Sequence, residues 1–274
     1  MNLVAAMRGQ YCRSERLLWA SVSVKAVIYL ATLAIAVWSD PTAAAVLLVV
    51  ACVGQACLYV LRFATQNHLA LAERLRRLAM LRDGVGREVV PLEAAILAEK
   101  VWNAAKLDQP DPYYSSKLPK GPKRLIDVTA ECAFFSGSIG AAAGRVFQVA
   151  SVAATSVLVL SLVLLIVLGV TQSRLEIAAK VVLIGVTFWM TEDLVDMAFK
   201  YRSLGSSCER ILQECSRLLD QVNPSVEDAY VVLHDYDAAV AGAPPLPSLI
   251  YRKRNARLTE IWQATHPRTT AKSA

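Results

Sequence analysis

The chain has 274 residues, of which 55% are hydrophobic and 19% are charged, and its net charge is +6. Its mean hydropathy of +0.40 is too high for an ordinary soluble protein, and its charges fall in blocks between long apolar runs. No basic stripe interleaved with aromatic residues is present, so we expect no DNA binding. The positive charge instead fits a protein that faces an anionic membrane leaflet. The composition therefore predicts an all-α membrane protein.

Four apolar runs in the sequence are long enough to cross a hydrocarbon core of about 30 Å as helices. They cover residues 17–38, 43–61, 147–170 and 178–197. The first and second are separated only by Ser39-Asp40-Pro41-Thr42, a turn that requires an antiparallel hairpin. No A-x-A cleavage site follows the first run, so we expect an uncleaved anchor. The sequence thus predicts four transmembrane helices in two hairpins, the first (with an N-terminal helix) within residues 1–61 and the second within residues 147–197.

The charges next to these runs predict the orientation. The turn of the first hairpin has no Lys or Arg, whereas basic residues precede the first and third runs and follow the second and fourth. They are Arg8, Arg13, Arg16, Arg62, Arg74, Arg76, Arg77, Arg145, Lys200 and Arg202. The positive-inside rule then places both termini and the middle segment in the cytoplasm. Arg174 and Lys180 in the second turn oppose this rule without changing the result.

Two cytoplasmic segments, 62–146 and 198–266, are predicted to be helical extensions of the hairpins. In the first, an amphipathic pattern continues the second span and ends at Asp83-Gly84-Val85-Gly86. A further helix begins at Pro91, and a loop rich in proline and glycine covers residues 107–124.

The second cytoplasmic segment contains three predicted helices. The first has one apolar face, formed by Cys208, Ile211, Leu212, Cys215, Leu218, Leu219 and Val222. Asn223-Pro224 is expected to begin the next helix, which reaches about Val240. Pro244-Pro245-Leu246-Pro247 then breaks the chain before a basic helix from Ser248 to about Trp262. Residues 267–274 are expected to be disordered.

Small residues and cysteines are interpreted as packing elements. Glycines 137, 140 and 144 have the spacing that lets helices approach closely, and no G-K-[ST] follows them to make a nucleotide loop. The six cysteines form no C-x-x-C pair or zinc spacing and are expected to be small buried residues of a reducing compartment. The three histidines are far apart, without H-E-x-x-H. We therefore expect no enzyme, no metal and no cofactor.

Five polar residues in or beside the apolar runs are candidate pore or gate residues. They are Lys25, Gln55, Glu192, Asp193 and Asp196. Lys25 either extends to the membrane surface, faces a pore or pairs with a carboxylate, and Gln55 marks a contact between helices. The three carboxylates either form an acidic ring in an oligomer, as in cation pores, or lie solvated beyond a fourth span that ends at Met190. The sequence leaves these alternatives open.

The loop before the third span is the predicted ligand site. Tyrosines can stack on a base, while hydroxyls and cations hold phosphates. The candidates are Tyr113, Tyr114, Ser115, Lys117, Lys120, Lys123 and Arg124 in the loop, with Arg252 and Arg254 in the basic tail helix. The same cations serve a loop that lies on anionic lipid equally well. Both interpretations stay open.

Three short motifs resemble the SMODS-associated four-transmembrane effector family. They are Asp111-Pro112-Tyr113-Tyr114, Glu131-Cys132-Ala133-Phe134-Phe135, and the stretch from Pro244 to Arg254. With the two hairpins, the resemblance covers nearly the whole chain, although Cys132 stands where a small residue such as serine is expected. No ligand-contact motif of the family can be carried over to individual residues here.

The resemblance implies an antiphage effector of the CBASS type. Such proteins are encoded beside nucleotidyltransferases that make cyclic oligonucleotide signals, and the effector oligomerises and forms a pore or disrupts the membrane. A competing hypothesis is a membrane-anchored helical scaffold that recruits a cytoplasmic partner without a pore. A membrane-embedded enzyme is the weakest, because the sequence contains no nucleophile–base pair or metal cluster.

Overall fold

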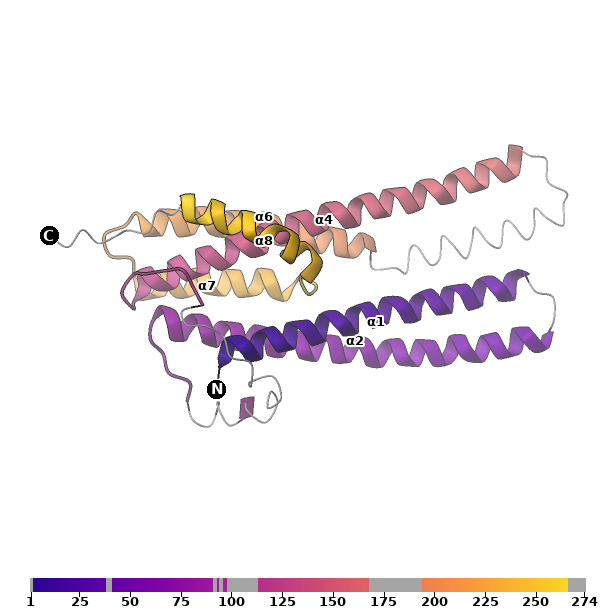
Figure 1. The fold of residues 1–274 in the computed structure, drawn as a ribbon, viewed down its shortest axis with the longest axis horizontal. Coiled ribbons are helices and arrows are strands. Elements are labelled where there is room, and N and C mark those ends of the chain that lie inside the picture. The colour runs from indigo at the N-terminus through magenta and orange to yellow at the C-terminus, as the bar shows by residue number, and fades with distance from the viewer. Residues whose placement is uncertain are drawn as a thin grey trace. The chain divides into compact units, whose positions relative to one another are not determined.

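The computed structural model describes residues 2–37, 41–90, 93, 96–97, 113–167 and 194–265. Six helices form the fold in this part of the chain, which contains no strand. They are α1 (Leu3–Val37), α2 (Pro41–Gly84), α4 (Pro122–Val167), α6 (Leu194–Leu219), α7 (Val226–Ala241) and α8 (Ser248–Thr265) (Figure 1). The prediction of an all-helical protein is confirmed.

The chain divides into two compact units. Unit 1 comprises Met1–Glu15, Asn67–Gly144 and Phe199–Ala274, and unit 2 comprises Arg16–Gln66 and Arg145–Ala198. In sequence, unit 2 corresponds to the two predicted hairpins and unit 1 to the predicted cytoplasmic segments. Helices α1, α2, α4 and α6 each contribute residues to both units.

Unit 2 exposes many large apolar side chains and buries several polar ones. Between 61% and 68% of the surface is exposed for Val49, Val60, Phe63, Val149 and Leu160. At most 8% is exposed for Ser21, Lys25, Thr65 and Ser151. Several hydroxyls bond to their own helix, as Thr65 Oγ1 does to the Leu61 carbonyl at 2.7 Å. This distribution is the reverse of that in a water-soluble domain and is favoured in lipid.

Two helical stretches, Ala45–Gly84 and Pro122–Ala153, are long and apolar enough to cross a membrane. They overlap the second and third predicted spans. The first predicted span is helical as far as Val37, where the description of α1 ends. Most of the fourth, up to residue 193, lies outside the described residues. The four-span topology therefore remains a prediction.

The end of α2 and the start of α4 lie close to their predicted positions. α2 continues past the second span as one helix and ends at Gly84, and Gly86 has a φ of 75°, which glycine adopts without strain. The predicted loop ends earlier than expected. Proline suits the first helical position, so α4 begins at Pro122 and includes Lys123 and Arg124 in its first turn. Residues 98–112, with most of the helix expected from Pro91, lie outside the described residues.

The α6 helix buries the predicted apolar face in the core of unit 1. Cys208, Ile211, Cys215 and Leu218 are buried there. Val222 was predicted on the same face but is exposed, because α6 ends at Leu219.

The start of α7 differs from the prediction by two residues. Ser225, not Asn223, caps the helix: its Oγ accepts a hydrogen bond from the Asp228 N–H at 3.0 Å, and the Asp228 carboxylate accepts one from the Ser225 N–H at 3.2 Å. This reciprocal capping box satisfies two otherwise unpaired donors. The basic helix α8 begins at Ser248 as predicted and extends to Thr265.

Helices α4 and α6 approach closely at glycines in unit 1. A Cβ atom added to Gly137 would lie 2.7 Å from Cys208 Cβ, and one added to Gly140 would lie 3.1 Å from Leu204 Cδ2. Side chains at these two positions would push the helices apart. The prediction that Gly137 and Gly140 serve close helix packing is confirmed.

The cysteines differ in exposure. Cys208 and Cys215 are buried, and burial raises the pKa of each thiol to about 12. Cys12, Cys52 and Cys57 are exposed in the isolated chain. The prediction of buried cysteines is therefore wrong for these three.

We expect this difference to appear in alkylation by iodoacetamide at pH 8. Raising a thiol pKa from about 9 to about 12 lowers its thiolate fraction roughly a thousandfold, and the thiolate is the nucleophile. Peptide mass spectrometry of the full chain in detergent should show Cys12 modified at least about a hundredfold faster than Cys208 and Cys215. Similar rates for Cys12 and Cys208 would contradict the buried face of α6.

Candidate functional site

Ser115, one of the predicted ligand residues, joins the loop to two helices of unit 1. Its N–H and its Oγ both donate to Glu131 Oε2 on α4, each at 2.9 Å. The same Oγ accepts from Trp262 Nε1 on α8 at 3.0 Å. The structure therefore brings the start of the predicted loop beside the tail helix, but the hydroxyl itself is occupied.

The two predicted arginines with the most contacts are also held by the protein. Arg124 donates from Nε and Nη2 to the two carboxylate oxygens of Asp83, at 3.1 and 2.9 Å, and from Nη1 to the Leu118 carbonyl at 2.8 Å. Arg254 donates from Nη1 to the Ser138 carbonyl at 3.0 Å. Arg124 thus joins the start of α4 to the end of α2, and Arg254 joins α8 to α4.

The tyrosine pair is split between core and surface. Tyr114 is buried in the apolar core, and burial raises its pKa well above the ordinary value. Tyr113 is exposed, and the guanidinium carbon of Arg8 lies 5.0 Å from its ring centroid, a cation–π contact. Only Tyr113 presents a ring that a ligand can reach.

The remaining predicted ligand cations lie at the surface. Lys117, Lys120 and Arg252 are exposed, and Lys123 is half-buried. Lys120 lies next to Gly86: its Cδ would be 3.1 Å from a Cβ atom added to that glycine. Their role as ligand residues remains a prediction.

Three of the predicted pore residues fall within the described part of unit 2. Lys25 is buried, whereas Gln55 and Asp196 are exposed. Glu192 and Asp193 lie outside the described residues. Gln55 therefore lies at the surface of the isolated chain and not in a contact between described helices.

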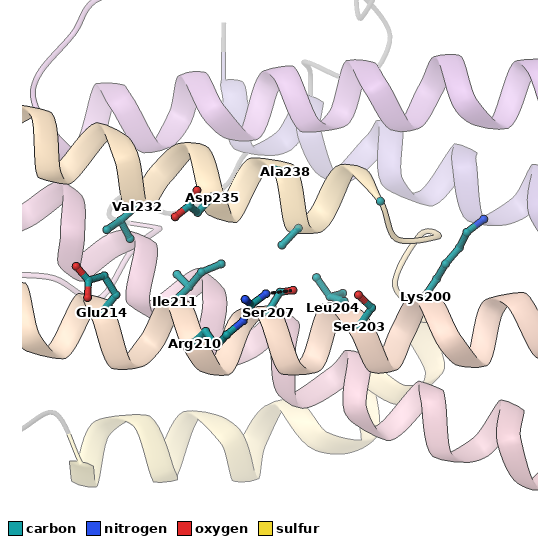
Figure 2. Close-up of a pocket in the computed structure, with 12 residues that line it drawn as sticks. Lys200, Ser203, Leu204, Ser207, Arg210, Ile211, Glu214, Val232, Asp235 and Ala238 are labelled. Atoms are coloured by element: carbon teal, nitrogen blue, oxygen red, sulfur yellow. Dashed lines mark hydrogen bonds between the residues drawn. The ribbon is translucent and has the colours of Figure 1, made fainter.

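A groove of about 600 Å³ lies between α6 and α7 of unit 1 (Figure 2). It is lined by Lys200, Ser203, Leu204, Ser207, Arg210, Ile211, Glu214, Val232, Asp235, Ala238, Ala239 and Gly242. A volume of this size is within the range of small-molecule sites. None of the ligand residues predicted from the sequence lines it.

The groove has an apolar floor and polar walls. Leu204, Ile211 and Val232 form the buried floor. On the α6 wall, Arg210 Nη2 donates to Ser207 Oγ at 3.3 Å. Glu214 is paired with Arg217 at 2.5 Å, and this bond holds the pKa of Glu214 below its usual range. On the α7 wall, the exposed Asp235 has no ion-pair or hydrogen-bond partner among the described residues.

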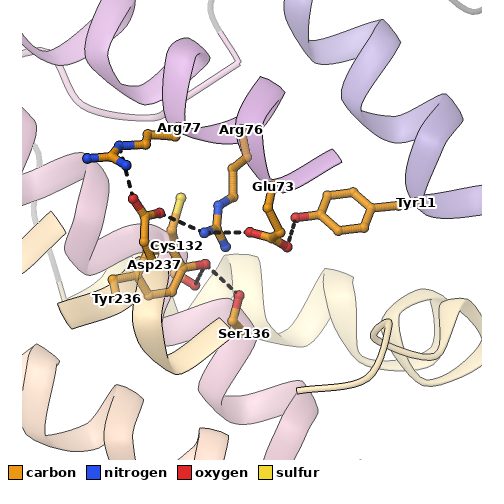
Figure 3. A network of polar contacts seen from close by, with 8 residues as sticks. All are labelled: Tyr11, Glu73, Arg76, Arg77, Cys132, Ser136, Tyr236 and Asp237. Atoms are coloured by element: carbon orange, nitrogen blue, oxygen red, sulfur yellow. Dashed lines mark hydrogen bonds and ion pairs between the residues drawn. The ribbon is translucent and has the colours of Figure 1, made fainter. Parts of the chain in front are cut away.

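The opposite face of α7 takes part in a buried ionic network (Figure 3). Arg76 Nη2 on α2 lies 2.9 Å from Asp237 Oδ1 and 2.6 Å from Glu73 Oε2. Glu73 also accepts a hydrogen bond from Tyr11 on α1. The Arg76 guanidinium carbon lies 4.4 Å from the Tyr236 ring centroid. The network therefore joins α7 to α1 and α2.

The network extends to α4 through Tyr236. Tyr236 Oη lies 2.8 Å from Ser136 Oγ. Burial raises the pKa of Tyr236 well above its usual value, so the phenol stays protonated. All four helices are thus connected by buried polar contacts that must keep their partners to remain favourable.

The groove was missed by the sequence interpretation, although a signal was present. Its polar α6 residues stand at positions 200, 203, 207, 210 and 214, steps of three or four residues that place them on one helix face. The sequence predicts the apolar stripe of α6 but assigns no role to the adjacent polar stripe. Only the packing of α7 against α6 shows that this stripe faces a groove.

Comparison with known proteins gives no assignment. No protein-family model matches this chain, and neither the curated proteins nor the solved structures provide a match. A function for this chain must therefore be argued from the groove, the ionic network and the surface of unit 2.

Proposed function

We propose that this chain is a bacterial inner-membrane antiphage effector. A cyclic oligonucleotide binds unit 1, and the chain then oligomerises and forms a leak through its membrane segments. The proposal includes four transmembrane helices in two hairpins and cytoplasmic termini. The observation that carries it is the apolar surface of unit 2, which buries several polar side chains, whereas unit 1 has an ordinary apolar core. The motif resemblance to the SMODS-associated four-transmembrane effectors supports the signal class.

The helices that supply both units offer a route from ligand to membrane. α2 contributes Arg76 to the network of unit 1 and Val60 and Phe63 to the apolar surface of unit 2. α7 lines the groove on one face and holds Arg76 through Asp237 on the other. A ligand changes the state of the protein only if it binds one state more tightly than the other. A shift of α7 that alters the Asp237–Arg76 contact would act directly on α2.

The polar residues of unit 2 are the proposed pore or gate. Asp196 lies in the first turn of α6, and Glu192 and Asp193 precede it in sequence. Repeated around an oligomer, the three carboxylates would form an acidic ring suited to cations. Lys25 and Gln55 are the further candidates on α1 and α2.

The test is ion leak from vesicles that contain the purified full chain. We expect a panel of cyclic di- and trinucleotides to include one that collapses a potassium potential, followed with a potential-sensitive dye. Glu192→Gln, Asp193→Asn and Asp196→Asn together should lower the leak at least about tenfold, because the ring loses its charge. The matched control neutralises Glu209, Asp220 and Glu227, three exposed carboxylates of unit 1.

Two results would count against this proposal. An unchanged potential at saturating concentrations of every cyclic oligonucleotide contradicts the effector and favours the scaffold without a pore. A leak of full size in the triple variant removes the carboxylates from the ion path but keeps the effector.

A further inference from the structure

The groove between α6 and α7 has separate places for the chemical parts of a nucleotide. We infer that it is the ligand site of unit 1, with the phosphates of an oligonucleotide held by Arg210 and Lys200 and a base held at Asp235. The inference rests on the proposed function for the class of signal. The site differs from the loop and tail residues that the sequence predicted.

The cations of the groove are spaced for more than one phosphate. Lys200 and Arg210 are ten positions apart on α6, a separation of about 15 Å along the helix axis. A single phosphate cannot engage both at once without bending each long side chain toward the middle of the groove. A ligand with two phosphates meets one cation with each, and Ser203 and Ser207 lie between them as hydroxyl donors.

The two carboxylates that line the groove, Glu214 on α6 and Asp235 on α7, bear on where the base of such a ligand binds. Glu214 pairs with Arg217 at 2.5 Å, and this contact offsets part of the repulsion that its carboxylate exerts on a phosphate. Asp235, on α7, has no partner among the residues that the structure describes, and its carboxylate only accepts hydrogen bonds. Bases with an exocyclic amino group can donate to it, as cytosine N4 does to acidic residues.

The floor and the α7 wall leave room for flat rings. Leu204, Ile211 and Val232 present a dry apolar floor, which is suited to a nucleobase face. Ala238 on α7 and Gly242 directly after it carry almost no side chain, so the groove stays open beside them. Larger residues at these positions would fill the space between the helices.

The experiment is titration calorimetry of the full chain in detergent with cyclic dinucleotides of defined bases and with linear dinucleotides. We expect Arg210→Gln and Lys200→Gln each to weaken binding at least tenfold. The matched control is Arg202→Gln, an exposed arginine of the same helix that does not line the groove. It should change affinity less than twofold. Asp235→Asn should reduce the preference for an amino-bearing base over uracil at least fivefold.

Ala238→Leu provides a test that does not depend on charge. It should abolish binding by filling the groove while thermal unfolding without ligand stays unchanged within a few degrees. Tight binding to the wild type that is unaffected by Arg210→Gln and Ala238→Leu would overturn the groove as the site and leave the proposed function standing. Groove-dependent binding of linear but not cyclic dinucleotides would keep the site and contradict the proposed signal. Absence of binding by every dinucleotide would overturn the groove as the site, and the proposed function would then depend on a cyclic trinucleotide.

Discussion

Replacing Arg76 with methionine is expected to destabilise unit 1 by about 3–5 kcal/mol, the usual cost of breaking a buried ion pair by removing one partner. The Arg76 side chain is only 6% exposed, and its partners Glu73 and Asp237 are 15% and 16% exposed. Without the guanidinium, Glu73 loses its counter-charge and Asp237 keeps only the solvent-exposed Arg77, so two carboxylates remain in a poorly hydrated site with their charge largely uncompensated. Thermal unfolding in detergent, followed by near-ultraviolet circular dichroism, measures the loss.

Arg77 provides a matched control on the next position of the same helix. Its Nε lies 3.3 Å from Asp237 Oδ2, but its side chain is 52% exposed. Solvent screens such a pair, so Arg77→Met should cost no more than about 1 kcal/mol. Equal losses in the two variants would contradict the buried network.

Neutralising the two carboxylates separates loss of charge balance from loss of packing. Adding Glu73→Gln and Asp237→Asn to Arg76→Met should recover a large part of the stability, because no unpaired charge then remains buried. The effects of the three substitutions should therefore be strongly non-additive. Additive losses would mean that Arg76 contributes mainly through its contact with the Tyr236 ring.

The sequence predicts that arginines follow the second span, but it cannot say which one is buried. Arg74 and Arg77 are about half exposed, whereas Arg76 is enclosed. Its partner Asp237 is 161 positions away in the chain. Which face of α2 packs against α7 depends on tertiary packing, so the local sequence pattern cannot predict which arginine is buried.

The same reasoning explains the two adjacent tyrosines. The local sequence gives no reason to prefer Tyr113 over Tyr114 as a stacking residue, yet only Tyr113 is exposed.

Features that depend on short-range chemistry were predicted better. The end of α2 follows from the glycines at 84 and 86, and the apolar face of α6 follows from helical periodicity. The groove required knowledge of two helices at once, and periodicity in one helix does not provide it.

Replacing Gly137 with valine is expected to cost about 3 kcal/mol, at the upper end for overpacked sites. The added Cβ would lie 2.7 Å from Cys208 Cβ and 3.7 Å from the Gly205 carbonyl oxygen. Neither atom is the end of a flexible side chain, so α4 and α6 must separate. The gain in helix propensity on replacing glycine is at most about 1 kcal/mol and does not offset this. Thermal unfolding in detergent again measures the change.

Gly242→Val is the control, since the nearest atoms to its added Cβ are carbonyl oxygens 3.8 Å away. It should change stability by no more than about 0.5 kcal/mol. The cause can be tested directly by removing the opposing Cβ. Because Cys208→Gly opens the space that valine needs, the double variant with Gly137→Val should be more stable than the sum of the two single losses predicts. Simple additivity would place the strain elsewhere than at the α4–α6 crossing.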